Sequence, residues 1–208
     1  MRVAIALVAV VLSCLAAAGP AVARGDGARA PVRATFVGDS VAASISYAST
    51  AKAQLERGLF VRLDLKVCRR LVQPSCAYQG SAPPTALEVV RGLGSSLGRV
   101  VIVKVGYNES ARGYRAGIDR VMRAALAQGA AGVVWVTLRE TTSTYHWTNV
   151  AIKAAAKRWP QLVVADWNAH SARKPWFGHD GLHLSAAGAT ALAAFLRPYV
   201  FRAAAAHA

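Results

Sequence analysis

Two kinds of hydrophobic pattern alternate along most of the chain. Short apolar or alternating runs, typical of strands, occupy 33–37, 61–67, 100–105, 132–138 and 162–165. Between them, apolar residues recur at helical spacing in 41–55, 84–93, 114–126, 149–159 and 186–196. Five strands separated by helices predict an α/β fold in which helices cover both faces of a parallel sheet.

Capping and helix-breaking residues mark where several of these helices are expected to begin and end. Gly58 follows the first helical repeat, and glycine is favoured just after a helix end. Thr148 or Asn149 is expected to cap the fourth helix, and Ser185 the last one. Pro198 is expected to stop the last helix, because proline has no backbone N–H with which to continue it.

Residues 1–23 have the features of a secretory signal peptide. Arg2 precedes the apolar run 3–12, and Ala21-Val22-Ala23 forms a small-x-small cleavage site. The apolar run is too short to span a membrane comfortably. We therefore expect cleavage near Ala23 and a secreted protein without an integral membrane span. It would consist of a flexible leader (24–31), one domain (32–202) and a short tail (203–208).

Export also bears on the three cysteines. Cys14 lies in the signal segment, in a poor match to a lipoprotein processing site, and its lipidation stays open. An oxidising compartment favours a disulfide between Cys68 and Cys76. Those two cysteines make only half a metal-ligand set, and His179 with His183 lacks a third ligand at familiar spacing. We expect no metal and no other cofactor.

The chain is strongly basic, with 25 Lys and Arg against 10 Asp and Glu and a formal net charge of +15. Nucleic acid is not an expected partner, because the protein is expected outside the cell and carries no groove-reading motif. A positive surface would favour anionic cell-wall polymers or lipid head groups. Coding bias towards Ala, Arg, Gly and Val is the alternative explanation of the charge.

Three polar stretches follow predicted strands or precede a predicted helix. Gly38-Asp39-Ser40 lies where the first strand meets the first helix. A serine there is held at the carboxyl edge of the sheet, near a helix N-terminus that favours negative charge. That position suits a nucleophile, although a simple helix cap is the structural alternative. Gly106-Tyr107-Asn108 follows the third strand, and Asp180-Gly181-Leu182-His183 precedes the last helix.

Taken together, these stretches resemble the SGNH (GDSL-type) hydrolase family. Its first block is matched by Gly38-Asp39-Ser40, its third by Gly106-x-Asn108 and its fifth by Asp180-x-x-His183, in the family's order. The general lipase elbow G-x-S-x-G is absent, because position 42 is alanine. The resemblance implies a flavodoxin-like three-layer sandwich, with five parallel strands in the order 2-1-3-4-5.

The resemblance also implies a catalytic triad. Ser40 would be the nucleophile, and a serine hydroxyl needs a neighbouring base to take its proton. His183 would be that base, and Asp180 would fix its tautomer and stabilise the imidazolium. Asp39 would be structural, with its carboxylate bonded to the turn.

An oxyanion hole completes the site that the resemblance implies. The Ser40 N–H, the Gly80 N–H and the Asn108 amide would donate to the developing negative charge. Gly80 is assigned because the family's second block is a lone glycine in the loop after the second strand. Gly92 and Gly94 compete for this role, but they fall at a helix end and look like stop signals.

Three further residues are weaker candidates for substrate binding. Arg139 ends the fourth strand and would either meet an anionic substrate or pair with Glu140 or Asp166. Trp176 and Phe177 precede Asp180 and would either wall the acyl or sugar pocket or pack in the core.

The function expected from these residues is that of an exported serine esterase. It would hydrolyse a small acyl ester, such as an acetyl ester, through an acyl-enzyme on Ser40. Two alternatives stay open: an acyltransferase of the same fold that acts on cell-wall carbohydrate, and a non-catalytic wall-binding protein. The expected partner is an acylated carbohydrate or cell-wall polymer, and the expected state is a monomer.

Overall fold

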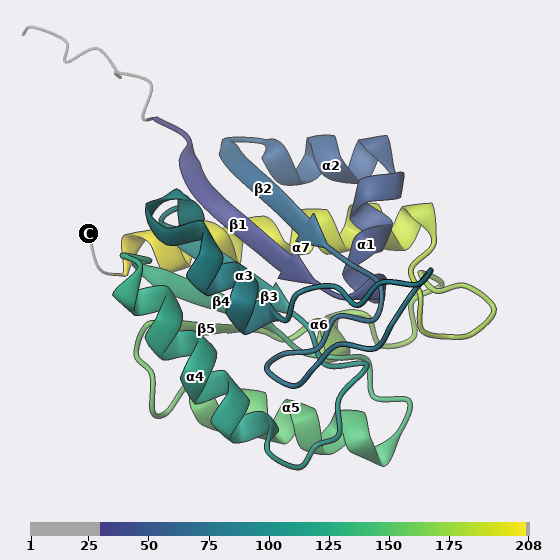
Figure 1. Ribbon diagram of the computed structural model, residues 1–208. Helices are drawn as coiled ribbons and strands as arrows, with labels where there is room; N and C mark the ends of the chain where they lie inside the picture. Colours follow the sequence, from purple (N-terminus) through teal and green to yellow (C-terminus); the bar gives the residue numbers. More distant parts are fainter. Residues whose placement is uncertain (1–29, 207–208) are drawn as a thin grey trace, which may run out of the picture. The chain divides into compact units, whose positions relative to one another are not determined.

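The computed structural model describes residues 30–206, so the predicted signal peptide and most of the predicted leader lie outside the described residues. Five strands form one sheet: β1 (Val32–Gly38), β2 (Leu59–Leu65), β3 (Val100–Lys104), β4 (Gly132–Val136) and β5 (Leu162–Ala165). All neighbouring strands are parallel, in the order β2-β1-β3-β4-β5 (Figure 1). The predicted fold class and strand order are confirmed.

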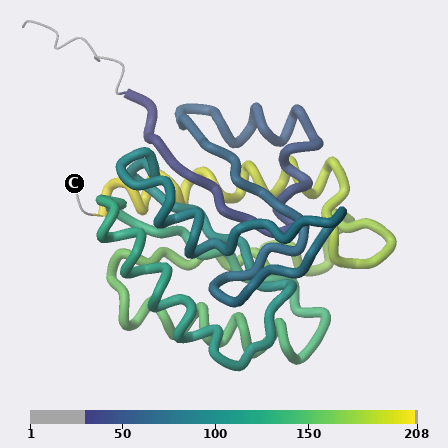
Figure 2. Tube along the Cα trace, in the orientation of Figure 1, coloured from purple at the N-terminus to yellow at the C-terminus, as the bar shows by residue number. Residues whose placement is uncertain are grey.

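Helices cover both faces of this sheet. One layer contains α1 (Ser40–Tyr47), α2 (Ser49–Glu56) and α7 (Ala186–Ala205). The other contains α3 (Ala86–Leu93), α4 (Tyr114–Ala127) and α5 (Ser143–Ala155), as the paths in Figures 1 and 2 show. A 3₁₀ helix, η1 (Gly94–Leu97), and a single helical turn, α6 (Trp167–His170), are further elements that the hydrophobic pattern did not predict.

Each face of the sheet has its own hydrophobic core, because successive strand residues point to opposite faces. In β3, Ile102 joins the core under α1, α2 and α7, whereas Val101 and Val103 join the core under α3, α4 and α5. Every residue of β3 is buried. This explains why the sequence of that strand is almost continuously apolar.

The first predicted helix is in fact two helices. The chain is extended at Ala48, with φ −109° and ψ 102°, and this residue separates α1 from α2. Ile45 of α1 and Leu55 of α2 are both buried in the same core. The apolar spacing continued across the break because both helices face that core, so the pattern alone did not reveal the bend.

The predicted cap of α5 is wrong. The helix begins at Ser143, and Thr142 is its cap, accepting a hydrogen bond from the Tyr145 N–H at 3.4 Å. Thr148 and Asn149 lie buried inside the helix. Asn149 instead bonds both backbone groups of Leu138, its amide nitrogen donating to the carbonyl and its amide oxygen accepting from the N–H, each at 2.7 Å.

The last helix does not stop at Pro198. Ser185 caps it as predicted, accepting from the Gly188 N–H at 3.1 Å, but the helix runs through Pro198 to Ala205. Ala203 and Ala204, in the predicted tail, belong to this helix and are buried. Their packing against the sheet offsets the cost of an internal proline, which is about 3 kcal/mol.

A long loop connects β2 to α3 and is tied by a disulfide. Cys68 and Cys76 are bonded as predicted, with their Cα atoms 5.2 Å apart. Within residues 30–206, none of the helices has both the length and the apolar character that crossing a membrane would require.

Candidate active site

The turn after β1 places Ser40 at the carboxyl edge of the sheet. Ser40 is the first residue of α1, and Asp39 caps the helix by accepting a hydrogen bond from the Val41 N–H at 3.2 Å. Gly38 is required here, since a Cβ at this position would lie 2.7 Å from Leu65 Cδ2 and would also clash with Ala42. The close approach of α1 to β2 therefore depends on the first glycine of the motif.

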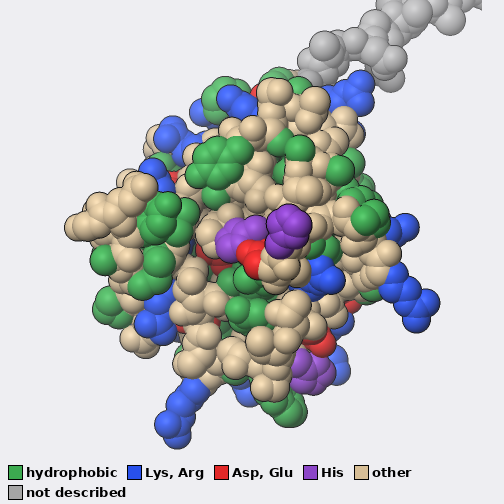
Figure 3. All heavy atoms as spheres, turned by 90° about the vertical axis from the view of Figure 1, so that its right-hand side faces the viewer, with side chains coloured by type: hydrophobic (Ala, Val, Ile, Leu, Met, Phe, Trp, Pro, Cys, Tyr) green, Lys and Arg blue, Asp and Glu red, His purple; other side chains and the backbone are tan. Residues whose placement is uncertain are grey.

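Ser40, His183 and Asp180 form a continuous hydrogen-bonded chain. His183 Nε2 lies 3.0 Å from Ser40 Oγ, and His183 Nδ1 lies 2.5 Å from Asp180 Oδ2. Ser40 and His183 are 143 positions apart in the sequence. Figure 3 shows histidine side chains and an acidic side chain together at the centre of one face, beside a hollow in the surface. This is the geometry that a nucleophile, a base and an orienting carboxylate require.

The Asp180 carboxylate is held in its charged form. Its Oδ1 accepts hydrogen bonds from the backbone N–H groups of Leu182, at 2.9 Å, and His183, at 3.0 Å. The hydrogen bond from the His183 side chain, followed by these two backbone bonds, lowers the pKa of Asp180 to about 2. The carboxylate can therefore orient the imidazole and stabilise a positive charge on it.

Asp39 links the turn after β1 to the turn after β3. Its carboxylate is fully buried and, besides the Val41 N–H, accepts from the N–H groups of Gly106 at 3.0 Å and Tyr107 at 3.2 Å. Burial raises the pKa of Asp39, and the nearby Lys104 and the three backbone bonds oppose that rise. The structural role expected for Asp39 agrees with these contacts, which hold the Asn108 turn next to the Ser40 turn.

The side chain of Asn108 meets the loop after β2. Its amide nitrogen donates to the Arg69 carbonyl at 3.2 Å, which leaves one amide hydrogen for another acceptor. Arg69 is fully buried, and its guanidinium bonds the Asp64 carboxylate at 2.7 Å and the Pro84 carbonyl at 2.9 Å. It also reaches the Gly38 carbonyl at 3.4 Å. Arg69 thus fixes the loop to the turn that carries Ser40.

Sequence reasoning did not identify Arg69. The only available signal was an arginine within the short segment between Cys68 and Cys76, and arginines are rarely buried without partners. The backbone at Cys68 is left-handed, with φ 63°, which is uncommon for a residue other than glycine. The disulfide and the buried guanidinium hold this unusual conformation.

The structure does not bring Gly80 to Ser40 through any described contact. Gly80 is exposed and lies at a tight turn, where Tyr78 and Ser81 exchange backbone hydrogen bonds of 2.9 and 3.2 Å. Gln79 and Gly80 both have positive φ, 50° and 78°, as this kind of two-residue turn requires. No hydrogen bond described for residues 30–206 joins Gly80 to Ser40 or Asn108. The turn by itself accounts for the glycine.

Arg139 does not form an ion pair with either predicted partner. Its guanidinium lies 3.7 Å from the centre of the Phe177 ring. Glu140 pairs with His146 at 3.0 Å, and Asp166 pairs with Lys153 at 2.8 Å. A salt bridge from Arg139 is absent among the residues that the structure describes, so its contact with Phe177 is the observed interaction.

Trp176 and Phe177 both pack against the core under α1, α2 and α7. Trp176 stacks on Trp167, with ring centroids 5.5 Å apart and planes 15° from parallel, and packs against the core. Phe177 pairs across an isolated β-bridge with Leu184, the residue after His183. Core packing, one of the two alternatives for this pair, is therefore observed for both residues, and Phe177 also lies in the loop that carries Asp180 and His183.

A buried lysine lies beneath the site and was not singled out from the sequence. Lys104 ends β3 and pairs with Gly38 in the sheet register. Its Nζ is buried without a hydrogen-bond partner in the described part of the chain and lies 5.0 Å from the centre of the Tyr107 ring. Burial lowers the pKa of Lys104 to about 8, and the Asp39 carboxylate opposes that shift.

No metal site accompanies the triad. Across residues 30–206, no group of three or more His, Cys, Asp and Glu side chains is placed to hold a metal ion. His179 is exposed, and no hydrogen bond or ion pair is described for its side chain.

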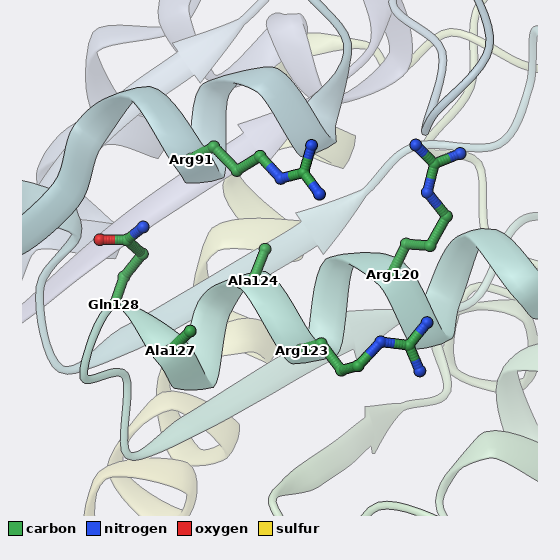
Figure 4. Close-up of a pocket in the computed structure, with 6 residues that line it drawn as sticks. All are labelled: Arg91, Arg120, Arg123, Ala124, Ala127 and Gln128. Carbon is green, nitrogen blue, oxygen red and sulfur yellow. The ribbon is translucent and has the colours of Figure 1, made fainter.

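A separate pocket of about 480 Å³ lies between α3 and α4. Arg91 of α3 and Arg120 and Arg123 of α4 line it, and the side chains of Arg91 and Arg120 extend into the space between the helices (Figure 4). No salt bridge is described for any of the three. This groove concentrates positive charge in one place on a basic protein.

Comparison with known proteins gives structural matches alone. No family model matches the chain, and no curated protein matches it. A carbohydrate acetylesterase family member from Sinorhizobium meliloti superposes with a TM-score of 0.64 at 14% identity, covering 83% of this chain and 99% of its own. The psychrotrophic esterase EstA from Pseudoalteromonas, in a form inhibited by monoethylphosphonate, has a TM-score of 0.54 at 10% identity, covering 82% and 96%. The chain therefore shares the fold of these two esterases, which is consistent with the SGNH (GDSL-type) resemblance of its motifs.

Proposed function

We propose that this protein is a serine esterase that removes a small acyl group through an acyl-enzyme on Ser40. The observation that carries the proposal is the continuous chain from Ser40 Oγ to His183 Nε2 at 3.0 Å and from His183 Nδ1 to Asp180 at 2.5 Å. A serine merely capping a helix would need neither partner. The ionised Asp180 supports the same assignment, because it can hold His183 in the tautomer that accepts a proton at Nε2.

The mechanism follows from the donors and acceptors around Ser40. His183 Nε2 takes the hydroxyl proton as Ser40 Oγ attacks the ester carbonyl carbon. The carbonyl oxygen becomes an oxyanion, and the Ser40 N–H and the free amide hydrogen of Asn108 donate to it. When the carbon–oxygen bond to the alcohol breaks, His183 returns the proton to the leaving oxygen. A water then attacks the acyl carbon while His183 takes its proton. The bond to Ser40 Oγ breaks, His183 returns the proton to that oxygen, and the free acid leaves.

An acetyl group on a carbohydrate is the substrate class that we infer. One structural match is described as a carbohydrate acetylesterase family member. The site itself is compatible with water as the acceptor, since the His183 side chain is 47% exposed. An acyltransferase would use the same acyl-enzyme but would pass the acyl group to a sugar hydroxyl, so the acceptor alone separates the two activities.

The direct test is hydrolysis of a panel of p-nitrophenyl esters of increasing acyl length and of an acetylated polysaccharide. We expect the wild type to release acetate and to prefer short acyl groups, and Ser40→Ala to lose both activities while retaining its fold by circular dichroism. Adding free carbohydrate acceptors distinguishes transfer from hydrolysis, because transfer forms an acylated sugar. Failure of the wild type to cleave any ester would support the non-catalytic wall-binding alternative.

We also infer that the protein acts outside the cytoplasm. The Cys68–Cys76 disulfide supports this, since such bonds persist in oxidising compartments. Expression of the full chain in a secreting bacterial host, followed by N-terminal sequencing of the exported product, should give a chain that begins just after Ala23. Retention of the uncleaved chain in the cytoplasm would contradict the inference.

We infer in addition that the positive charge favours contact with an acidic polymer that carries or adjoins the substrate. The observation that supports this is the groove between α3 and α4, where three arginines without described salt bridges lie together. Guanidinium groups are well suited to bidentate contacts with phosphate or carboxylate groups.

A further inference from the structure

A second pocket lies beside the Ser40 turn, between α1 and the loop after β2. It has a volume of about 460 Å³ and is lined in part by Tyr47, Lys66, Tyr78, Ser81 and Pro83. Tyr47 ends α1, Lys66 follows β2 directly, and the other three belong to the loop that the disulfide ties. The pocket therefore opens at the carboxyl edge of β1 and β2, where ligands bind in sheets of this kind.

Helix geometry connects this pocket to the proposed nucleophile. Ser40 and Tyr47 are the first and last residues of α1, which places them on the same face of the helix and about 10 Å apart along its axis. Ala43 and Ser44, both with small side chains, lie on the same side of the helix between them. Side chains on a helix lean towards its N-terminus, which directs Tyr47 back towards Ser40.

The loop presents Tyr78 from the opposite side. The Cys68–Cys76 disulfide ends two residues before Tyr78, and the Tyr78–Ser81 bridge adds two backbone hydrogen bonds, at 2.9 and 3.2 Å. Both constraints restrict where the Tyr78 ring can lie. A loop that is fixed at two places and yet exposes an aromatic ring is better suited to binding than to core packing.

The exposure of the two rings is unusual. Tyr47 is 82% exposed and Tyr78 is 48% exposed, and no hydrogen bond is described for either hydroxyl within residues 30–206. Tyrosine combines an apolar ring with a polar hydroxyl and is favoured at binding surfaces for that reason. The Lys66 ammonium and the Ser81 hydroxyl add polar groups to the same pocket.

We propose that this pocket binds the carbohydrate to which the scissile ester is attached, with the rings of Tyr47 and Tyr78 against the sugar. A sugar ring has apolar faces and an edge of hydroxyl groups, which matches a lining of aromatic rings and polar groups. A long acyl chain would need a continuously apolar lining, which Lys66 and Ser81 interrupt. The assignment rests on the proposed esterase function and specifies its substrate.

Steady-state kinetics on two esters tests the proposal. Acetylated xylo-oligosaccharide carries a sugar, whereas ethyl acetate carries the same acyl group without a ring. We expect Tyr47→Ala and Tyr78→Ala each to lower kcat/KM for the sugar ester about three- to tenfold, mainly through a higher KM. Turnover of ethyl acetate should stay within about twofold. Phe60→Ala is the matched control, because Phe60 is 54% exposed at the opposite end of β2.

Direct binding separates recognition from chemistry. Ser40→Ala protein should bind the acetylated oligosaccharide in a calorimetric titration, and adding Tyr47→Ala or Tyr78→Ala should weaken that binding. Equal losses on both esters, or no loss on either, would overturn the carbohydrate subsite while leaving the esterase proposal intact. If the wild type cleaves neither ester but the sugar still binds at the tyrosines, the esterase proposal fails and the binding site stands.

Discussion

Two aspartates near Ser40 differ in burial, and they therefore differ in the role that their carboxylates can have. Asp39 is fully buried, its pKa is raised by burial, and its oxygens hold three backbone N–H groups in place. The Asp180 side chain is 50% exposed, and hydrogen bonds lower its pKa to about 2. The first carboxylate fixes the two turns that carry Ser40 and Asn108. The second is held in its charged form beside the imidazole of His183, which becomes charged in the mechanism that we propose.

The two histidines of the 180s loop offer a matched pair of variants. His183→Ala should lower kcat about 10²–10⁴-fold, the loss usual for a general base. His179→Ala should leave kcat within about twofold, because no contact is described for its exposed side chain. Both are measured in parallel on one short ester. If the larger loss falls on His179, the assignment of the base is wrong.

At the same scale, sequence motifs pointed to the three residues that the structure joins in one hydrogen-bonded chain, but not to the residues that support them. Ser40, Asp180 and His183 belong to short local patterns, and local patterns are visible in a single sequence. Arg69 and Lys104 act through partners that are distant in the chain, the Gly38 carbonyl and the Asp39 carboxylate among them. Such contacts have no local sequence pattern, because only the fold brings the partners together.

Among the elements, β3 combines a buried apolar strand with a charge at its end. Lys104 is fully buried, and its pKa is lowered to about 8. A lysine in an unfolded chain titrates near 10.4. Below pH 8 both states keep the ammonium, and the cost of burying it is constant. Between pH 8 and 10 the unfolded chain binds more protons, so the free energy of unfolding should rise with pH.

Urea unfolding at several pH values tests this effect. From pH 8 to 10, the free energy of unfolding of the wild type should rise by about 2–3 kcal/mol relative to Lys104→Met, which keeps the volume but cannot titrate. Burial raises the pKa of Tyr107 and Tyr114, so in the folded state neither ionises in this range. If the free energy of unfolding changes with pH in the same way in wild type and variant, titration of Lys104 does not cause the rise.

The loop between β2 and α3 is the element that the disulfide stabilises. Replacing both cysteines by serine should lower the free energy of unfolding by about 2–3 kcal/mol, as expected for a short closed loop. It should also lower kcat, because the Arg69 carbonyl that holds Asn108 lies within this loop. Denaturation of wild type under reducing conditions is the control and should show the same loss. Unchanged stability after both treatments would contradict the assignment.

Element types followed from the hydrophobic pattern, whereas several boundaries did not. The five strands were predicted because β3 and β4 are fully buried and apolar, while the other strands still show short apolar or alternating runs. The break at Ala48 and the continuation past Pro198 were missed because tertiary packing decided both. In α5, Asn149 was expected as a cap, but its side chain forms hydrogen bonds with the backbone N–H and carbonyl of Leu138. Local propensity is a weak guide where a side chain has a distant partner.

On the scale of the whole molecule, the net charge of +15 is concentrated in part in the groove between α3 and α4. The double variant Arg120→Ser/Arg123→Ser should elute from a heparin column at clearly lower salt than the wild type. Arg62→Ser/Lys157→Ser is the charge-matched control, since both residues are exposed elsewhere on the protein. Equal shifts for the two double variants would show that overall charge, and not the groove, determines retention.

The fold and the candidate site meet at the carboxyl edge of the sheet. The β2-β1-β3 neighbours bring the Ser40 turn, the disulfide loop and the Asn108 turn together, and the loop before α7 adds His183. The sequence predicted this edge through strand order and motif order. The pocket between Tyr47 and Tyr78 was not predicted, because an exposed tyrosine has no recognisable pattern until its neighbours are known.

Covalent labelling with a fluorophosphonate, read by peptide mapping, tests the central claim most directly. The probe reacts with a serine only when a neighbouring base activates its hydroxyl. We expect stoichiometric labelling of the wild type at Ser40 alone, and almost none in His183→Ala, which keeps the serine but removes the base. Labelling of a different residue, or equal labelling of wild type and His183→Ala, would contradict the serine esterase account.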